Sequence, residues 1–288
     1  MQSFKQIAIL AAISTTSLSP VFADTVSPVQ SKATPFGLQR IGLVQLAGSD
    51  VAAADFSANA LPDLQASVNN TLTESQPLAN LSAIALDPND LVISGTADVR
   101  AYFVGEGAGY RNSFGVYTGD SSDGLNGDAA LILPDASSSS SYFNPTESTY
   151  RSRYAPVAAG DFVDLGTFEN GTQLNLFLIA NGANGGSETY YTDMSLNRDG
   201  IDHFVVLATP DSPYLLIGTE DLFNGGDKDY NDLVVALDVG RATAQKLISK
   251  AVPLPAPVIA LLGPLFFIGM SRWKRRRTQK PELFAHAD

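Results

Sequence analysis

The sequence contains no cysteine. This excludes a disulfide framework, a thiolate zinc site and a cysteine nucleophile. Basic residues are scarce in the central part, since residues 24–251 hold 11 Lys and Arg against 28 Asp and Glu, a net charge of about −17. Such a charge disfavours nucleic acid as a partner and favours cations, or neutral and basic surfaces.

Several motifs with a known chemistry are also missing. The chain has no P-loop, no nucleophile elbow and no HExxH zinc motif. It shows no repeat with a period of 20 to 50 residues, which disfavours a solenoid or a propeller. With 288 residues it is nevertheless long enough to bury a sizeable core.

The N-terminus has the three parts of a signal peptide. A short basic region, Met1–Lys5, precedes the apolar run Ile7–Ser14, and small residues occupy the −3 and −1 positions at Val21 and Ala23. We therefore expect residues 1–23 to be removed by cleavage after Ala23. A buried first helix is the alternative, but it would make the cleavage pattern accidental.

The other end predicts a single C-terminal transmembrane helix. Val252–Met270 carries no charge over about the length that crosses ~30 Å of hydrocarbon, and Lys274–Arg277 follow as a basic stop. Because Lys and Arg stay on the cytoplasmic side, the body is expected outside and the tail 278–288 inside. A buried core helix is the alternative, which the prolines opening the segment and the basic cluster closing it disfavour.

The order Val-Pro-Leu-Pro-Ala-Pro (252–257), apolar helix and arginine cluster over residues 252–277 resembles the C-terminal sorting signals of the PEP-CTERM type, in their VPLPA variant. The resemblance implies an exosortase-type processing enzyme as a partner. It also implies a destination at the cell surface or in the polysaccharide matrix, either anchored in the membrane or released.

Between the ends we expect three segments. Residues 24–87, rich in Ala, Ser and Asn, are expected to form a partly ordered arm with short helices around 51–69. Residues 88–240 alternate short apolar runs with Gly, Asn and Asp, which predicts an all-β antiparallel sandwich or jelly roll. Residues 241–251 are expected to be a linker. The predicted strands are Ala97–Val104, Asn112–Tyr117, Ala129–Leu133, Phe162–Phe168, Gln173–Ala180, His203–Ala208, Tyr214–Gly218 and Leu233–Val239.

A dense acidic loop joins the last two predicted strands. Its candidate metal ligands are Glu220, Asp221, Asp227, Asp229, Asn231 and Asp232. Carboxylates held this close repel one another unless they take up protons or a cation. Ca²⁺ suits them best, because it accepts six to eight oxygen ligands in irregular loops. The spacing D-x-D-x-N opens like an EF-hand loop, but Asp232 stands where that loop needs glycine and a strand follows, so an EF-hand is rejected.

Two other interpretations of the loop stay open. Its side chains could cap turns at the rim of a sandwich by accepting backbone N–H groups. They could also take part in catalysis, with Glu106, Glu220 or Asp221 as acid or base and His203 assisting. His203 alone is more typical of a packing residue, and Glu106 of a hairpin connection.

Four segments together, EGAGYRNSFGVYTG, AGDFVDLGTFENGTQLNLFLIANG, NRDGIDHFVVLA and TEDLFNGGDKDYNDLVVAL, resemble a bacterial family catalogued as domain of unknown function 4114, over residues 88–240. The family occurs in exported and surface proteins. Its acidic positions, matched by Glu220, Asp221, Asp227, Asp229 and Asp232, have prompted suggestions of enzymatic activity. We expect an exported surface or matrix protein with a calcium-binding loop, contacting polysaccharide or neighbouring cells; the alternative is an extracellular glycan hydrolase or lyase.

Overall fold

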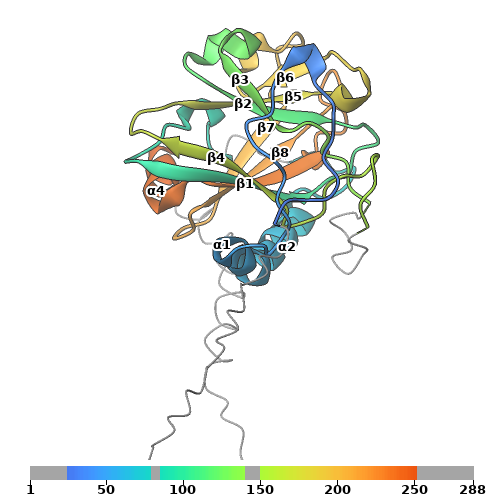
Figure 1. Cartoon of the computed structure of the whole chain (residues 1–288). Coiled ribbons are helices and arrows are strands. Elements are labelled where there is room, and N and C mark those ends of the chain that lie inside the picture. The colour runs from blue at the N-terminus through green and yellow to red at the C-terminus, as the bar shows by residue number, and fades with distance from the viewer. Residues whose placement is uncertain (1–24, 79–84, 140–149, 252–288) are drawn as a thin grey trace, which may run out of the picture.

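Two antiparallel sheets lie face to face (Figure 1). The computed structural model describes residues 25–78, 85–139 and 150–251. One sheet has the strand order β4-β1-β9-β8-β7 and the other β3-β2-β5-β6. The strands are β1 (Ala97–Gly105), β2 (Ser113–Thr118), β3 (Asp128–Leu133), β4 (Phe162–Phe168), β5 (Leu174–Ile179), β6 (Thr189–Tyr191), β7 (Phe204–Ala208), β8 (Tyr214–Thr219) and β9 (Leu233–Asp238). The predicted all-β sandwich is confirmed.

The predicted strands agree with the observed ones to within one residue at each end. The run Gln173–Ala180, expected to be buried on both faces, contains β5, whose six residues are all buried. β6 was not predicted. It has three residues and pairs only with β5, and so short a strand leaves no alternating pattern in a sequence.

Alternation along the central strands produces two apolar layers. In β1, Val99, Ala101 and Phe103 enter the core between the sheets. Tyr102 and Val104 point from the opposite face into a second cluster. This two-residue period is that of a strand buried on both sides, so the five-stranded sheet needs a cover on its outer face.

A helical segment provides that cover. It consists of α1 (Val51–Asp55), the π-helical turn η2 (Phe56–Ala60) and α2 (Leu61–Thr71), and lies beneath the five-stranded sheet in Figure 1. Phe56 is fully buried and stacks on Tyr102 with ring centroids 3.8 Å apart. Pro62 has no N–H to donate, and the N–H of Leu61 bonds to Phe56 five residues back, so the helix widens here. Residues 51–71, expected within a partly ordered arm, are thus a packed layer of the domain.

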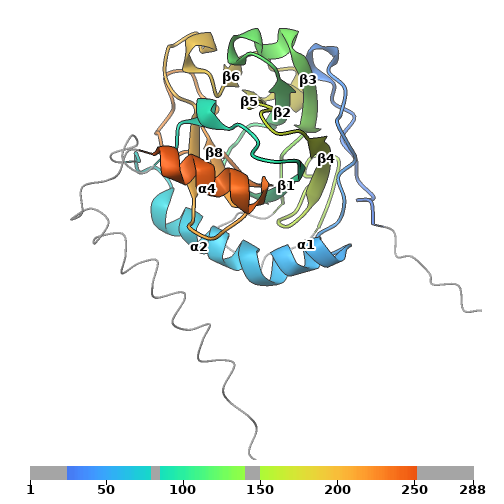
Figure 2. The same ribbon diagram turned by 90° about the vertical axis from the view of Figure 1, so that its left-hand side faces the viewer.

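The segment 241–251, expected to be a linker, forms most of α4 (Gly240–Lys250), which crosses one side of the sandwich (Figure 2). Ala244 and Leu247 join the core between the sheets, and Thr243 Oγ1 accepts the backbone N–H of Ser94 at 3.0 Å. Only three of its residues are buried. So small an apolar face gives only a weak indication of a packed helix in an otherwise polar stretch of sequence.

Five short helical turns complete the described elements: η1 (Pro35–Gly37), η3 (Pro88–Asp90), η4 (Ser121–Asn126), η5 (Gly182–Asn184) and η6 (Met194–Leu196). The predicted signal peptide 1–23 and the predicted membrane segment 252–277 with its tail 278–288 lie outside the described residues. Within the parts of the chain that are described, every helix is too short or too polar to cross a bilayer.

Candidate metal centre

The loop between β8 and β9 has an unusual backbone. Five of its residues have positive φ: Asn224 (67°), Gly225 (74°), Gly226 (48°), Lys228 (61°) and Tyr230 (57°). Left-handed geometry is strained for residues with a side chain, and least usual for bulky ones such as tyrosine. Contacts with the rest of the fold must therefore hold the loop in this shape.

A pair of carboxyl groups closes the base of this loop. The backbone N–H of Asp221 donates to Asp232 Oδ2 at 2.8 Å, and Asn112 Nδ2 donates to Asp221 Oδ2 at 2.7 Å. Burial, followed by the negative charge of Asp221, raises the pKa of Asp232 to about 8. Burial also raises the pKa of Asp221. Ionising both buried acids would bring two negative charges close together, which is unfavourable. The pair therefore retains a proton near neutral pH unless a cation replaces it.

Glu220 directly follows β8, and its side chain is buried within the loop. Its side chain is 1% exposed, and Oε1 accepts the N–H of Tyr230 at 2.8 Å. Oε2 is buried and has no hydrogen-bond partner among the described residues. It lies under Gly226, where a Cβ atom would approach it to 2.7 Å. Burial, and then the charges of Asp229 and Asp227, raise the pKa of Glu220 to about 8.

Three further carboxylates meet on the outer side of the loop. Oxygens of Glu74, Asp227 and Asp229 lie within 4.8 Å of one another. Asp229 is 2% exposed and accepts N–H groups from Ser75 at 2.7 Å and Asn231 at 3.1 Å, whereas the other two carboxylates are exposed. Burial, and then the charges of Asp227 and Glu74, raise the pKa of Asp229. Oxygen atoms so arranged are the ligands that hard cations prefer.

Asn231 connects this cluster to the helical segment. Its Nδ2 donates to the carbonyl of Leu72 at 3.3 Å and to Glu74 Oε2 at 3.4 Å. Its Oδ1 lies where a Cβ on Gly107 would come within 2.7 Å. The amide therefore positions Glu74 beside the two aspartates, and a side chain at position 107 would push this amide aside.

The six residues predicted as ligands thus fall into neighbouring groups. Asp227 and Asp229 lie in the outer cluster, Glu220 lies beneath it, Asp221 and Asp232 close the base, and Asn231 contacts Glu74. Two important side chains were not predicted. Glu74 lies three residues after the end of α2 and Asn112 directly precedes β2, and no local motif marks either residue as a partner of the loop.

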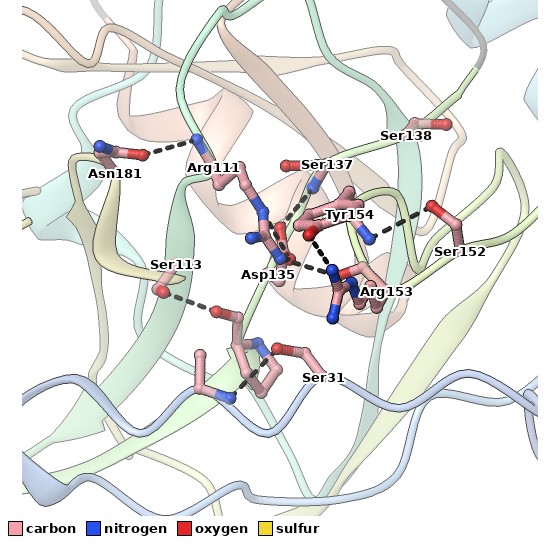
Figure 3. A network of polar contacts seen from close by, with 12 residues as sticks. Ser31, Arg111, Ser113, Asp135, Ser137, Ser138, Ser152, Arg153, Tyr154 and Asn181 are labelled. Carbon is pink, nitrogen blue, oxygen red and sulfur yellow. Dashed lines mark hydrogen bonds and ion pairs between the residues drawn. The ribbon is translucent and has the colours of Figure 1, made fainter. Parts of the chain in front are cut away.

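A second polar network surrounds Arg111, just before β2 in the sequence, and Asp135 (Figure 3). Arg111 forms an ion pair with the buried carboxylate of Asp135 and donates to the carbonyl of Arg153 at 2.8 Å. The backbone N–H of Arg111 donates to Asn181 Oδ1 at 3.2 Å, and the N–H of Asn181 donates to Asn112 Oδ1 at 2.9 Å. Asn112 thereby keeps its NH₂ group directed at the loop.

The residues considered for catalysis are mostly buried. His203 is fully buried; Nδ1 lies 2.9 Å from the carbonyl of Glu220, Nε2 lies 2.9 Å from Asp199 Oδ2, and its ring stacks on Tyr190. Glu106 accepts the N–H of Ser138 at 3.1 Å. Burial, and then the charges of Asp135 and Asp221, raise its pKa to about 7. Both ring nitrogens of His203 therefore already have hydrogen-bond partners within the protein.

A depression of about 340 Å³ lies next to the loop. Its lining consists of Pro77, Leu78, Met194, Gly200, Ile201, Asp202, Lys228 and Tyr230. Glu106, Glu220 and Asp221 do not contribute to it. The acids considered for catalysis are therefore placed away from the walls of this depression.

Comparison with known proteins identifies one domain. The family described as "Domain of unknown function (DUF4114)" matches residues 168–240, from the end of β4 to the start of α4. The match contains the whole acidic loop and lies in the C-terminal half of the range 88–240 over which the sequence resembles this family. It leaves out Glu74, Glu106 and Asn112. No curated protein and no solved structure matches the chain.

Proposed function

We propose that this chain is an exported surface or matrix protein whose β8–β9 loop binds Ca²⁺ as part of its structure. The single observation that supports calcium best is the carboxylate of Glu220, which is 1% exposed with one oxygen unpartnered beneath Gly226, next to Asp227. An unpaired buried oxygen of this kind costs stability in the free protein. A cation with open coordination positions removes that cost.

Calcium suits the loop better than magnesium. The donors are carboxylates from an irregular, tightly turned segment, and two of the three outer ones are exposed, which leaves room for water ligands. Ca²⁺ accepts six to eight oxygens at about 2.3–2.6 Å with flexible geometry, whereas Mg²⁺ requires near-octahedral sites at about 2.0–2.1 Å. We infer that magnesium competes poorly.

The location outside the cell is supported by the two termini of the sequence. Residues 1–23 have the pattern of a signal peptide, and residues 252–277 that of a sorting signal with a membrane helix and a basic stop. We propose an exosortase-type enzyme as the processing partner and extracellular polysaccharide or cell-surface components as contacts. Deleting residues 252–288 should move the protein from the membrane fraction into the medium; retention in the membrane fraction would contradict the proposed anchor.

Thermal unfolding tests the calcium site. The full chain, kept soluble in a mild nonionic detergent, is unfolded in excess CaCl₂, in MgCl₂ and in EGTA. At a calcium concentration ~100 times the dissociation constant, binding adds about 2.7 kcal/mol, which raises the melting temperature by roughly 5–10 °C for a domain of this size.

Two double variants with the same loss of charge provide the comparison. Asp227→Asn with Asp229→Asn should abolish the calcium shift. Asp63→Asn with Asp128→Asn removes two exposed carboxylates away from the loop and should keep the shift. A wild-type melting temperature that is equal in calcium and in EGTA would rule out the proposed site.

A further inference from the structure

The segment that follows α2 is attached to the acidic loop at three points. The N–H of Ser75 donates to Asp229 Oδ2 at 2.7 Å, the N–H of Leu78 donates to the carbonyl of Lys228 at 2.8 Å, and the side chain of Asn231 donates to the carbonyl of Leu72. Residues 72–78, here called the helix extension, therefore lie directly against the loop although about 150 residues separate them in the sequence.

The helix extension adds a carboxylate where two are already present. Glu74 places an oxygen within 4.8 Å of oxygens on Asp227 and Asp229. No Lys or Arg nitrogen forms an ion pair with any of these three residues within the described ranges. Like charges at this separation repel, so without a counterion the cluster pushes the helix extension away from the loop.

A second observation indicates that the cluster holds a ligand. The carboxylate of Glu220 is almost completely buried, and its Oε2 has no partner among the described residues. Its Oε1 accepts the N–H of Tyr230, directly after Asp229, and its Oε2 lies where a Cβ on Gly226, directly before Asp227, would come within 2.7 Å. Both oxygens therefore lie against the stretch of backbone that carries Asp227 and Asp229. A polar oxygen that is buried without a partner usually marks the place of an ion or water.

We propose that one Ca²⁺ ion is bound jointly by Glu74, Asp227 and Asp229, with Glu220 beneath them, and that it fastens the helix extension to the sandwich. This inference rests on the proposed calcium-binding function and adds that the bound ion holds the helix extension in place. The ion replaces the repulsion between the two segments by shared coordination. Calcium thereby regulates how firmly the C-terminal end of α2 is held.

The N-terminal end of the helical segment, residues 51–60, should not respond to calcium. Phe56 is fully buried, stacks on Tyr102 and meets Tyr214 edge-on at 5.2 Å, so apolar packing holds residues 51–60. Beyond Leu72, the residues of the helix extension are exposed or half-buried. The two ends thus provide an internal comparison within one chain.

Hydrogen exchange measured by mass spectrometry, together with calcium titration calorimetry, tests the proposal on the full chain in mild detergent. In the wild type, calcium should slow amide exchange in residues 68–78 by about tenfold or more relative to EGTA, and leave residues 51–60 unchanged. Glu74→Gln should weaken calcium binding by about tenfold and abolish this protection. Calcium should still protect residues 220–232 in that variant. Asp63→Asn, on the same helical segment, should behave like the wild type.

The outcomes separate the inference from the function on which it rests. If Glu74→Gln binds calcium with unchanged affinity and still protects residues 68–78, the bridge is refuted while the calcium site in the loop stands. If the wild type binds no calcium in the titration, both are refuted. If Asp227→Asn with Asp229→Asn abolishes binding and Glu74→Gln loses only the protection of residues 68–78, the bridge is supported.

Discussion

Replacing Glu220 by glutamine should have opposite effects on stability with and without calcium. Glutamine keeps the shape of the side chain and the Oε1 atom that accepts the N–H of Tyr230 at 2.8 Å. It removes the acid, whose ionisation in the calcium-free protein is opposed by burial and by the charges of Asp229 and Asp227. In the calcium-bound protein that we propose, the carboxylate of Glu220 is a ligand, so its loss should be harmful there.

The size of the effect follows from proton linkage. Burial, and then the neighbouring charges, raise the pKa of Glu220 from its ordinary 4.5 to about 8. The folded state therefore binds this proton more tightly than the unfolded chain does. The resulting stability is fully present below about pH 4.5 and is lost as the pH rises towards about 8. At pH 7 the folded protein keeps a proton that the unfolded chain releases, which costs about 3 kcal/mol, and an incompletely bonded buried amide costs about 1–2 kcal/mol.

In EGTA at pH 7, Glu220→Gln should thus be more stable than the wild type by about 1–2 kcal/mol, a rise in melting temperature of roughly 2–8 °C. In saturating calcium it should be the less stable of the two. Urea unfolding between pH 5 and pH 8 measures both. Glu169→Gln, which changes an exposed carboxylate, is the matched control. A wild type whose calcium-free stability does not fall between pH 5 and pH 8, or a variant that is destabilised in EGTA, would refute the reasoning.

Three further substitutions test the surrounding structure by urea unfolding. Gly226→Ala should lower the free energy of unfolding by about 1–3 kcal/mol, because its Cβ would lie 2.7 Å from a buried carboxylate oxygen at a φ of 48°. Gly171→Ala, also at positive φ but in open space, should lower it by less. Equal losses would contradict the close approach. Arg111→Met should cost about 3–5 kcal/mol by leaving the fully buried Asp135 carboxylate unpaired, and adding Asp135→Asn should recover part of it; no recovery would contradict the ion pair. Leu247→Ala should cost about 2–4 kcal/mol if α4 is part of the core, and under 0.5 kcal/mol if residues 241–251 were a free linker.

The sequence predicts the strands well because each carries its own signal. β5 and β9 are runs of apolar residues bounded by turn residues, and their six positions are buried almost throughout. β6 lacks such a signal because pairing with β5 alone defines its three residues. α4 and the segment 51–71 escape prediction as parts of the domain for a related reason: each contacts the sandwich through a few apolar side chains, such as Phe56 and Leu247, whose partners lie far away in sequence.

The composition of the loop was visible in the sequence, but its partners were not. Asp227 and Asp229 are conspicuous because acidic residues alternate there over a short stretch. Glu74 and Asn112 stand in ordinary polar surroundings and reach the loop only through the fold, the first by way of the helix extension and the second from the residue directly before β2. Local patterns report local structure, whereas ligand sets are assembled by tertiary contacts.

The loop departs from what stability alone would favour in the calcium-free chain. Lys228 and Tyr230 adopt left-handed backbone conformations, at about 1 kcal/mol or more each. Glu220 and Asp232 have pKa values raised to about 8 by burial, so folding holds groups that ionise readily in water. A loop of neutral turn residues would connect β8 to β9 without either cost. Such local costs concentrate at functional sites. Here both kinds occur in the loop that carries Asp227 and Asp229, whose oxygens lie within 4.8 Å of one another and of Glu74, an arrangement that a hard cation would stabilise and that turn capping does not require.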